Sequence, residues 1–126
     1  MGQPAAKQGD QVVALDTHVV VIGLVPTPVP HPFAGVVAGA LSADVRVMGR
    51  PAATVGSTAD NAPPHVPLGG PFVKPPHNTG LIVAGSATVR VNGRPLARNG
   101  DAALTCNDPV DLPVGSVVAA GTVLAG

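Results

Sequence analysis

Residues 89–100 read VRVNGRPLARNG, and residues 45–56 read VRVMGRPAATVG. The two stretches agree at eight of twelve positions with an offset of 44 residues, so they form an internal repeat. In each copy a Val-Arg-Val run precedes Asn92-Gly93 or Met48-Gly49, and an Arg-Pro phrase follows. Asn-Gly is a strong signal for a two-residue hairpin turn, because both turn positions need a positive φ. Each copy therefore predicts a short β-hairpin.

A third, partial copy opens the chain. Residues 4–10, PAAKQGD, align with residues 51–57 and 95–101, but the strand that should precede them is missing. The segment 116–126, SVVAAGTVLAG, has the β-branched residues of that strand and stops where its turn should follow. We therefore expect the two chain ends to meet and to complete a third hairpin with pseudo-threefold symmetry.

The composition agrees with an all-β fold. The 126 residues suit a single domain, 1–126, and the 16 Gly and 15 Pro disfavour helix interiors. The apolar residues are mostly Ala and Val, with two Phe and neither Trp nor Tyr, so the core should be thin. We predict a small, tapering all-β fold of three pseudo-threefold β-hairpin repeats.

Charge and patterning exclude other classes. The formal net charge is zero and the basic residues are dispersed, so we expect no nucleic-acid partner. The longest apolar stretch, at 114–126, is short and interrupted by Gly, which argues against an integral membrane protein. The first residues lack a basic segment followed by an apolar one, so we expect no secretory signal and synthesis in the cytoplasm. The single cysteine cannot form an internal disulfide, so a bound metal is the candidate cross-link between distant parts of the chain.

The repeat register predicts the ligands of such a metal. His18 follows Gly9 by nine residues, His65 follows Gly56 by nine, and Cys106 follows Gly100 by six. If the repeats are related by rotation, these three side chains converge on the axis. Structural zinc takes four imidazole or thiolate ligands in a tetrahedron. A structural zinc ion is favoured over a catalytic one, because a tapering β-structure has little apolar interior near its narrow end.

The fourth ligand is open between two histidines. His31 lies in PTPVPHPF and His77 in VKPPHNTG, both proline-rich and extended. We favour His31, because its proline-locked run is longer and follows the His18 strand.

The phrases QPAAKQGD, GRPAATVG and GRPLARNGD resemble the Pro-Ala-Ala-Arg repeats of PAAR-domain proteins, over essentially the whole chain. The resemblance implies a small conical or pyramidal fold whose base docks on the trimeric β-helical spike of a type VI secretion system, a phage tail or another contractile injection device. It implies a vertex metal, usually zinc with iron as the alternative, held by His18, His65 and Cys106 with His31 as the fourth ligand. The chain departs from the motif at Thr54, Ser57 and Leu96, and carries the PTPVPHPF insertion.

The implied function is a structural spike tip rather than an enzyme. One chain would cap each spike trimer, of the valine-glycine-repeat or phage type, sharpen it for envelope puncture, and carry effector proteins by contact, since we expect no fused toxin domain. The protein would lie in the cytoplasm before assembly, then at the tip of the apparatus, and be delivered outside the cell or into the target.

Two alternatives come from other classes. A zinc hydrolase would need a carboxylate base beside a zinc-bound water, and the sequence contains no Glu, while Asp10 and Asp101 recur at repeat positions typical of turn chemistry. A free-standing β-repeat scaffold would make the histidines incidental.

Overall fold

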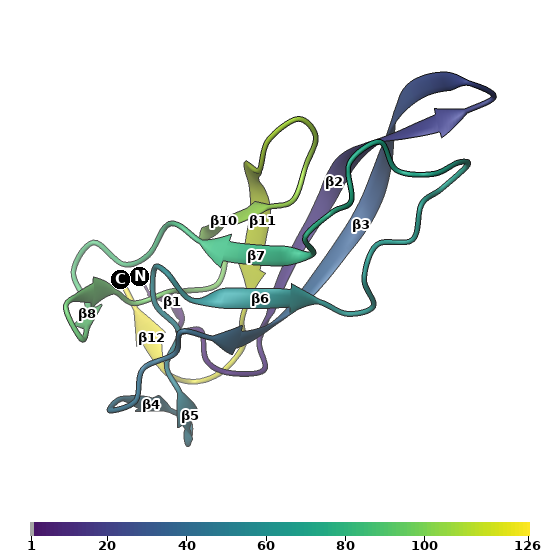
Figure 1. The fold of residues 1–126 in the computed structure, drawn as a ribbon. Coiled ribbons are helices and arrows are strands. Elements are labelled where there is room, and N and C mark those ends of the chain that lie inside the picture. The colour runs from purple at the N-terminus through teal and green to yellow at the C-terminus, as the bar shows by residue number, and fades with distance from the viewer. Residues whose placement is uncertain (1) are drawn as a thin grey trace.

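The structure is a computed structural model that describes residues 2–126; Met1, the first residue of the domain expected over 1–126, lies outside them. The described residues contain strands and no helix, which confirms the all-β prediction (Figure 1). The strands are β1 Gln3–Pro4, β2 Gln11–Ile22, β3 Val25–Gly39, β4 Arg46–Val47, β5 Arg50–Pro51, β6 Thr58–Asn61, β7 Thr79–Ile82, β8 Arg90–Val91, β9 Arg94–Pro95, β10 Ala102–Thr105, β11 Leu112–Val118 and β12 Leu124–Ala125.

Six strands close into a barrel in the order β10-β11-β2-β3-β6-β7, and every neighbouring pair is antiparallel. Each repeat contributes one pair, namely β2–β3, β6–β7 and β10–β11. The first strand of each pair begins two residues after the glycine that closes a repeat phrase, at Gln11, Thr58 and Ala102. The internal repeat of the sequence is therefore also the repeat of the barrel.

Three short hairpins lie at one end of the barrel, which we call the base (Figure 1). Two are the predicted pairs β4–β5 and β8–β9, with φ of 50° and 82° at Met48-Gly49 and 52° and 78° at Asn92-Gly93. The third is β1 paired with β12, so the chain ends meet as expected. Pseudo-threefold symmetry is thus present in the base hairpins.

Hydrogen bonds between alanine backbones join the three copies in a ring. The Ala6 N–H donates to the Ala97 carbonyl at 2.8 Å, the Ala97 N–H donates to Ala53 at 3.0 Å, and the Ala53 N–H donates to Ala6 at 3.0 Å. All three residues are fully buried. Because three backbone segments of the chain approach one axis here, only a small side chain fits.

The core is built in layers around this axis. Toward the base, a small cluster contains Ala5, Val47, Ala52, Val91, Leu96 and Ala125. Inside the barrel, the larger cluster includes Val12, Phe33, Val37, Ala59, Ile82, Ala103 and Val117. Phe33 is the largest fully buried side chain, which agrees with the thin core expected from the composition.

The second copy keeps the turn although it departs from the motif. The Lys7 and Arg98 N–H groups donate to the carboxylates of Asp10 and Asp101, at 3.0 and 2.8 Å. In the second copy the Thr54 N–H donates to the Ser57 hydroxyl at 3.0 Å. Serine thus supplies the same acceptor without the ion pair that Lys7 and Arg98 make with their aspartates. The interpretation of Asp10 and Asp101 as turn residues is confirmed.

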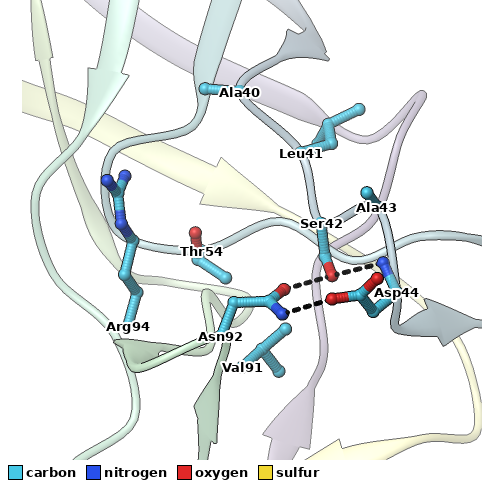
Figure 2. Close-up of a pocket in the computed structure, with 9 residues that line it drawn as sticks. All are labelled: Ala40, Leu41, Ser42, Ala43, Asp44, Thr54, Val91, Asn92 and Arg94. Atoms are coloured by element: carbon cyan, nitrogen blue, oxygen red, sulfur yellow. Dashed lines mark hydrogen bonds between the residues drawn. The ribbon is translucent and has the colours of Figure 1, made fainter.

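Side-chain contacts tie two base hairpins together beside a hollow of about 420 Å³ (Figure 2). The Ser42 hydroxyl donates to the Asn92 side-chain carbonyl at 2.5 Å, and the Asn92 amide donates to Asp44 at 2.8 Å. Ser42 and Asp44 precede β4, whereas Asn92 is in the β8–β9 turn. The two hairpins are therefore fixed relative to each other.

At the other end, which we call the distal end, the long β2–β3 hairpin extends beyond the barrel (Figure 1). Its strands pair without interruption from Gln11 with Val36 to Ile22 with Val25. The molecule therefore narrows from three hairpins at the base to one hairpin, flanked by the loop between β6 and β7, at the distal end (Figure 1). No helix in residues 2–126 is long and apolar enough to cross a membrane.

The alanine ring should tolerate no larger side chain. Replacing Ala53 with Val should lower the free energy of unfolding by about 1–3 kcal/mol, because the added methyl groups would overpack the axis. Urea unfolding followed by circular dichroism measures this. The control is Ala38→Val on an exposed position of β3, which should change stability by less than about 0.5 kcal/mol. Equal stability of the two variants would contradict the role given to the ring.

Candidate metal centre

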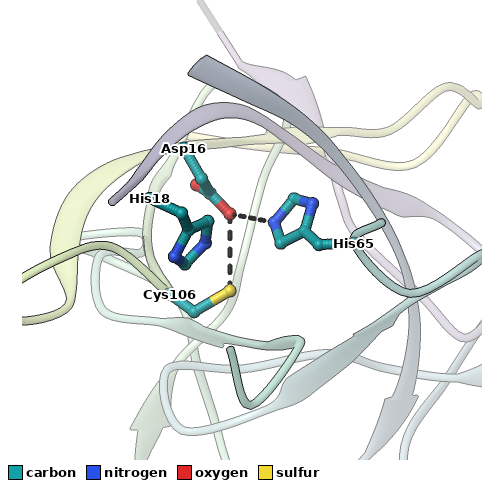
Figure 3. Close-up of side chains that lie close together, drawn as sticks. All are labelled: Asp16, His18, His65 and Cys106. Carbon is teal, nitrogen blue, oxygen red and sulfur yellow. Dashed lines mark hydrogen bonds and ion pairs between the residues drawn. The ribbon is translucent and has the colours of Figure 1, made fainter. Parts of the chain in front are cut away.

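Four side chains with metal-binding atoms meet inside the barrel at the end away from the base (Figure 3). Asp16 and His18 lie two positions apart on β2, so they point to the same side of the strand. His65 follows β6, and Cys106 directly follows β10. The three strands leave the base at equivalent points of the repeat, which is why residues distant in sequence converge here.

One donor atom from each residue lies within 4.8 Å of the others. The set is Asp16, His18, His65 and Cys106, of which three are buried and His65 is partly buried. In a tetrahedral zinc site with bonds of about 2.0–2.3 Å, donor atoms are about 3.3–3.8 Å apart. Small side-chain adjustments would bring these donors to that separation, so the cluster could bind a metal ion.

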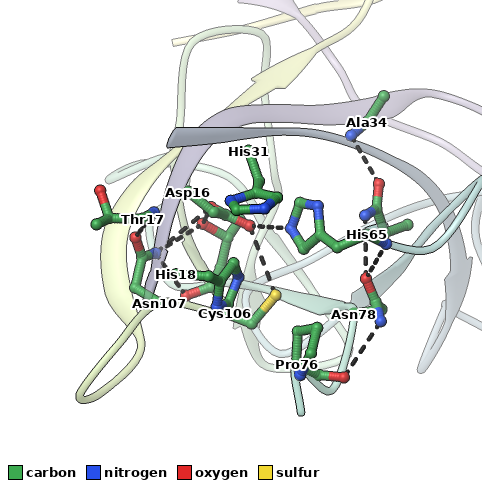
Figure 4. Close-up of polar contacts among 12 residues, drawn as sticks. Asp16, Thr17, His18, His31, Ala34, His65, Pro76, Asn78, Cys106 and Asn107 are labelled. Carbon is green, nitrogen blue, oxygen red and sulfur yellow. Dashed lines mark hydrogen bonds and ion pairs between the residues drawn. The ribbon is translucent and has the colours of Figure 1, made fainter. Parts of the chain in front are cut away.

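Asp16 is the centre of the polar contacts (Figure 4). Its carboxylate contacts His65 Nε2 at 2.8 Å and accepts hydrogen bonds from the Cys106 thiol at 3.5 Å and the Asn107 amide at 3.4 Å. The Thr105 hydroxyl donates to it as well. A fully buried carboxylate is costly unless donors surround it, and here four neighbours do so.

His18 is different, because neither of its ring nitrogens has a hydrogen-bond partner although both are buried. The nearest carboxylate, Asp108, lies 3.6 Å from Nδ1. Burial lowers the pKa of His18 below its ordinary value, and this effect exceeds the opposite effect of Asp108. A neutral buried imidazole with free nitrogens is ready to ligate a metal, and leaving it unpartnered is costly.

Cys106 is fully buried, and burial raises the pKa of its thiol to about 12. Thiolate is the form that binds metals, so a metal at this site would have to displace the thiol proton.

The two candidates for the fourth ligand lie in different places. The His31 ring lies next to the cluster, with its centroid 5.5 Å from His18 and 5.7 Å from His65. Its Nδ1 donates to the Val29 carbonyl at 2.8 Å, and its Nε2 accepts from the Leu68 N–H at 3.3 Å. His77 is exposed and pairs with Asp111 at 2.8 Å, outside the cluster.

A family model for the PAAR motif matches residues 28–110 of the chain. The match covers more than half of the sequence. The chain belongs to the PAAR-motif family. None of the curated proteins compared with it matches.

Membership gives the coarse role of this PAAR protein. The family forms spike tips of contractile injection systems, and it is structural rather than enzymatic. The resemblance drawn from the three repeat phrases is thereby confirmed. The matched region contains His31, His65 and Cys106 but begins after His18.

Sequence reasoning did not find Asp16 as a member of the cluster. The usable signal was its position two residues before His18 on a predicted strand, where alternation places both side chains on one face. Asp16 does not follow the repeat register on which the other candidates were chosen.

Asp16 should stabilise the cluster even without a metal. In chelator-treated protein, Asp16→Asn should lower the free energy of unfolding by about 1–3 kcal/mol, because an amide group replaces one acceptor oxygen among buried donors. Urea unfolding checks this against Asp60→Asn, an exposed position on β6 that should change stability by less than about 0.5 kcal/mol. If both variants matched the parent protein, the central role of Asp16 would be wrong.

Proposed function

We propose that the chain caps a trimeric β-helical spike, with one chain on each trimer. The support is the symmetry of the base: three hairpins around one axis offer three similar edges to three identical subunits. Pairing with the spike would also cover strand edges that otherwise invite aggregation. Apolar side chains exposed on these hairpins, such as Leu124 and Met48, would be buried in the contact.

The proposed metal is zinc, with iron as the alternative, held by His18, His31, His65 and Cys106. The unpartnered nitrogens of His18 and the buried thiol of Cys106 support two of these ligands, since zinc binds imidazole and thiolate. Zinc would cross-link the distal end and stabilise the fold there. Asp16 would orient His65, as carboxylates beside ligating histidines do, or replace His31 as the fourth ligand.

The chain, 1–126, would act as one domain, wait in the cytoplasm before assembly, and travel at the front of the spike out of the cell or into the target. Effector proteins would attach to it by contact. The metal would be structural, so the protein would have no catalytic role, in keeping with the family.

Zinc content tests the ligand set. His65→Ala and Cys106→Ala should each lose most of the bound zinc and melt at a lower temperature, because each variant lacks one of the proposed ligands. Elemental analysis of untagged protein and calorimetry measure both effects. His77→Ala is the control, and it should keep one zinc per chain. Full zinc in both His65 and Cys106 variants would refute the assignment.

The same measurement separates Asp16 from His31. If His31 is the fourth ligand, His31→Ala loses zinc, whereas Asp16→Asn keeps it with an affinity weakened about 10–100-fold. The opposite pattern would make Asp16 the ligand.

Capping can be tested with a purified trimeric spike. Light scattering after size exclusion should give a complex of three spike subunits and one chain. Leu124→Asp should weaken the complex, because it buries a charge in the docking face. Leu15→Asp, on the exposed outer side of β2, should leave it intact. A complex with one chain per spike subunit would overturn the proposal.

A further inference from the structure

The distal turn of the β2–β3 hairpin is strained and apolar. Leu24 is 94 % exposed, the highest value among the large apolar residues, and has a φ of 70°. A leucine disfavours this left-handed conformation, in which Gly or Asn is usual. Its neighbours Ile22 and Val25 are also exposed, at 40 % and 60 %. Both the backbone strain and the solvated apolar surface of this turn lower the stability of the fold. A contact with something outside the chain would explain why the turn has both.

The surroundings of the turn carry no charged residue over a long stretch. From Thr17 to Ala43 the sequence contains no Asp, Glu, Lys or Arg. The neighbouring loop, 62–73, has none either, and its Val66, Leu68 and Val73 are exposed. The distal end is therefore apolar over two separate segments that lie together.

The free edge of β3 at this end offers no backbone donors. Prolines occupy every second position before the strand reaches β6, at Pro26, Pro28, Pro30 and Pro32. Alternate residues of an antiparallel strand direct their backbone groups to opposite edges, and a proline cannot donate to a ladder. These positions therefore face away from β2, and the edge they form has carbonyl groups but no N–H.

The opposite edge, on β2, is already paired. The Val21 N–H donates to the Pro71 carbonyl at 2.9 Å, and the Val73 N–H donates to Val19 at 2.9 Å. The Val19 N–H donates to the Asp108 carboxylate at 2.8 Å. Unpaired backbone N–H and C=O groups make an extended segment costly to transfer into hydrocarbon. This hairpin has few unpaired N–H groups, so the carbonyls of the proline edge are the remaining cost.

We infer that the distal hairpin inserts into a lipid bilayer, with Leu24 leading and its flanking apolar residues following. The inference deepens the proposed function by naming the partner of the tip, and it rests on that function for its setting. Lys74 and Asp108 line a hollow together with Val19 and Pro26, so charge reappears at the level of Val19. With a rise of about 3.3 Å per residue, the turn extends about 13 Å beyond that level, which suits the headgroup and upper acyl region.

A lipid surface fits these features better than a protein does. The hairpin is a convex projection, and the proline edge cannot add a strand from a partner. A membrane needs neither a complementary groove nor matching hydrogen bonds. Association with a second copy of the chain through the tips is the competing outcome, and the test below detects it.

The chain contains no Trp or Tyr, so a single introduced tryptophan reports alone. Leu24→Trp should shift its emission to the blue on phosphatidylcholine vesicles and be quenched by brominated acyl chains. Adding phosphatidylglycerol or salt should change little, because the tip is uncharged. Met48→Trp is the matched control, since Met48 is 53 % exposed in a base turn with a φ of 50°. Quenching in the Leu24→Trp variant alone supports the inference. Equal quenching in both variants, or in neither, overturns it.

Leu24→Asn separates insertion from folding. Asparagine relieves the backbone strain, so the melting temperature should not fall, while vesicle partitioning of the chain should weaken about tenfold or more. Met48→Asn should leave partitioning unchanged. If Leu24→Asn lost partitioning and also melted at a lower temperature than the parent protein, the inference would be overturned. It would also be overturned if sedimentation showed that Leu24 drives self-association of the chain without lipid.

The two proposals fail in different ways. If the chain caps a spike trimer but its distal hairpin does not enter the bilayer, only the lipid inference is refuted. A tip that enters the bilayer on a chain that binds no spike would refute only the proposed capping.

Discussion

Three backbone hydrogen bonds, from Ala6 to Ala97 to Ala53 and back to Ala6, are the contacts on which the rest of the structure depends. They bring three distant parts of the chain to one axis and fix the angle between them. After each ring alanine the chain passes in order through the glycine that closes the turn, a pair of barrel strands and the next base hairpin, of which the last copy supplies only β12. The repeat phrase has alanine at these positions because the three backbone segments pack against one another and leave room for no more than a methyl group.

The base could be predicted from the sequence because its causes are local. Asn92-Gly93 encodes its turn because Asn and Gly accept a positive φ, and the internal repeat extends the same turn to Met48-Gly49. The repeated Arg-Pro phrase sets the returning strand. Even the third hairpin, formed by β1 and β12, follows from the missing half of the first copy. These features need no knowledge of distant contacts beyond the symmetry itself.

The distal end was predictable only in part, because each repeat departs from symmetry there. The register indicated His18, His65 and Cys106, which the barrel brings together. It gave no sign of Asp16, whose importance comes from donors that gather from several segments. The pairing of PTPVPHPF with β2 as a long hairpin also depends on the partner strand rather than on the prolines alone. Burial is similarly non-local: Phe33 fills the barrel, while Leu24, also apolar, is left in water.

The pairing of β1 with β12 has a consequence for how the protein is made. During synthesis, β1 must wait until β12 has been made before it gains its partner. Contacts between such distant residues form slowly, since a long loop has to close first. Until synthesis reaches Leu124, the base has two hairpins and an open third side, where β1 has an unpaired edge. The base therefore closes only after Leu124 and Ala125 have been made, so that a product truncated before them cannot present a finished base.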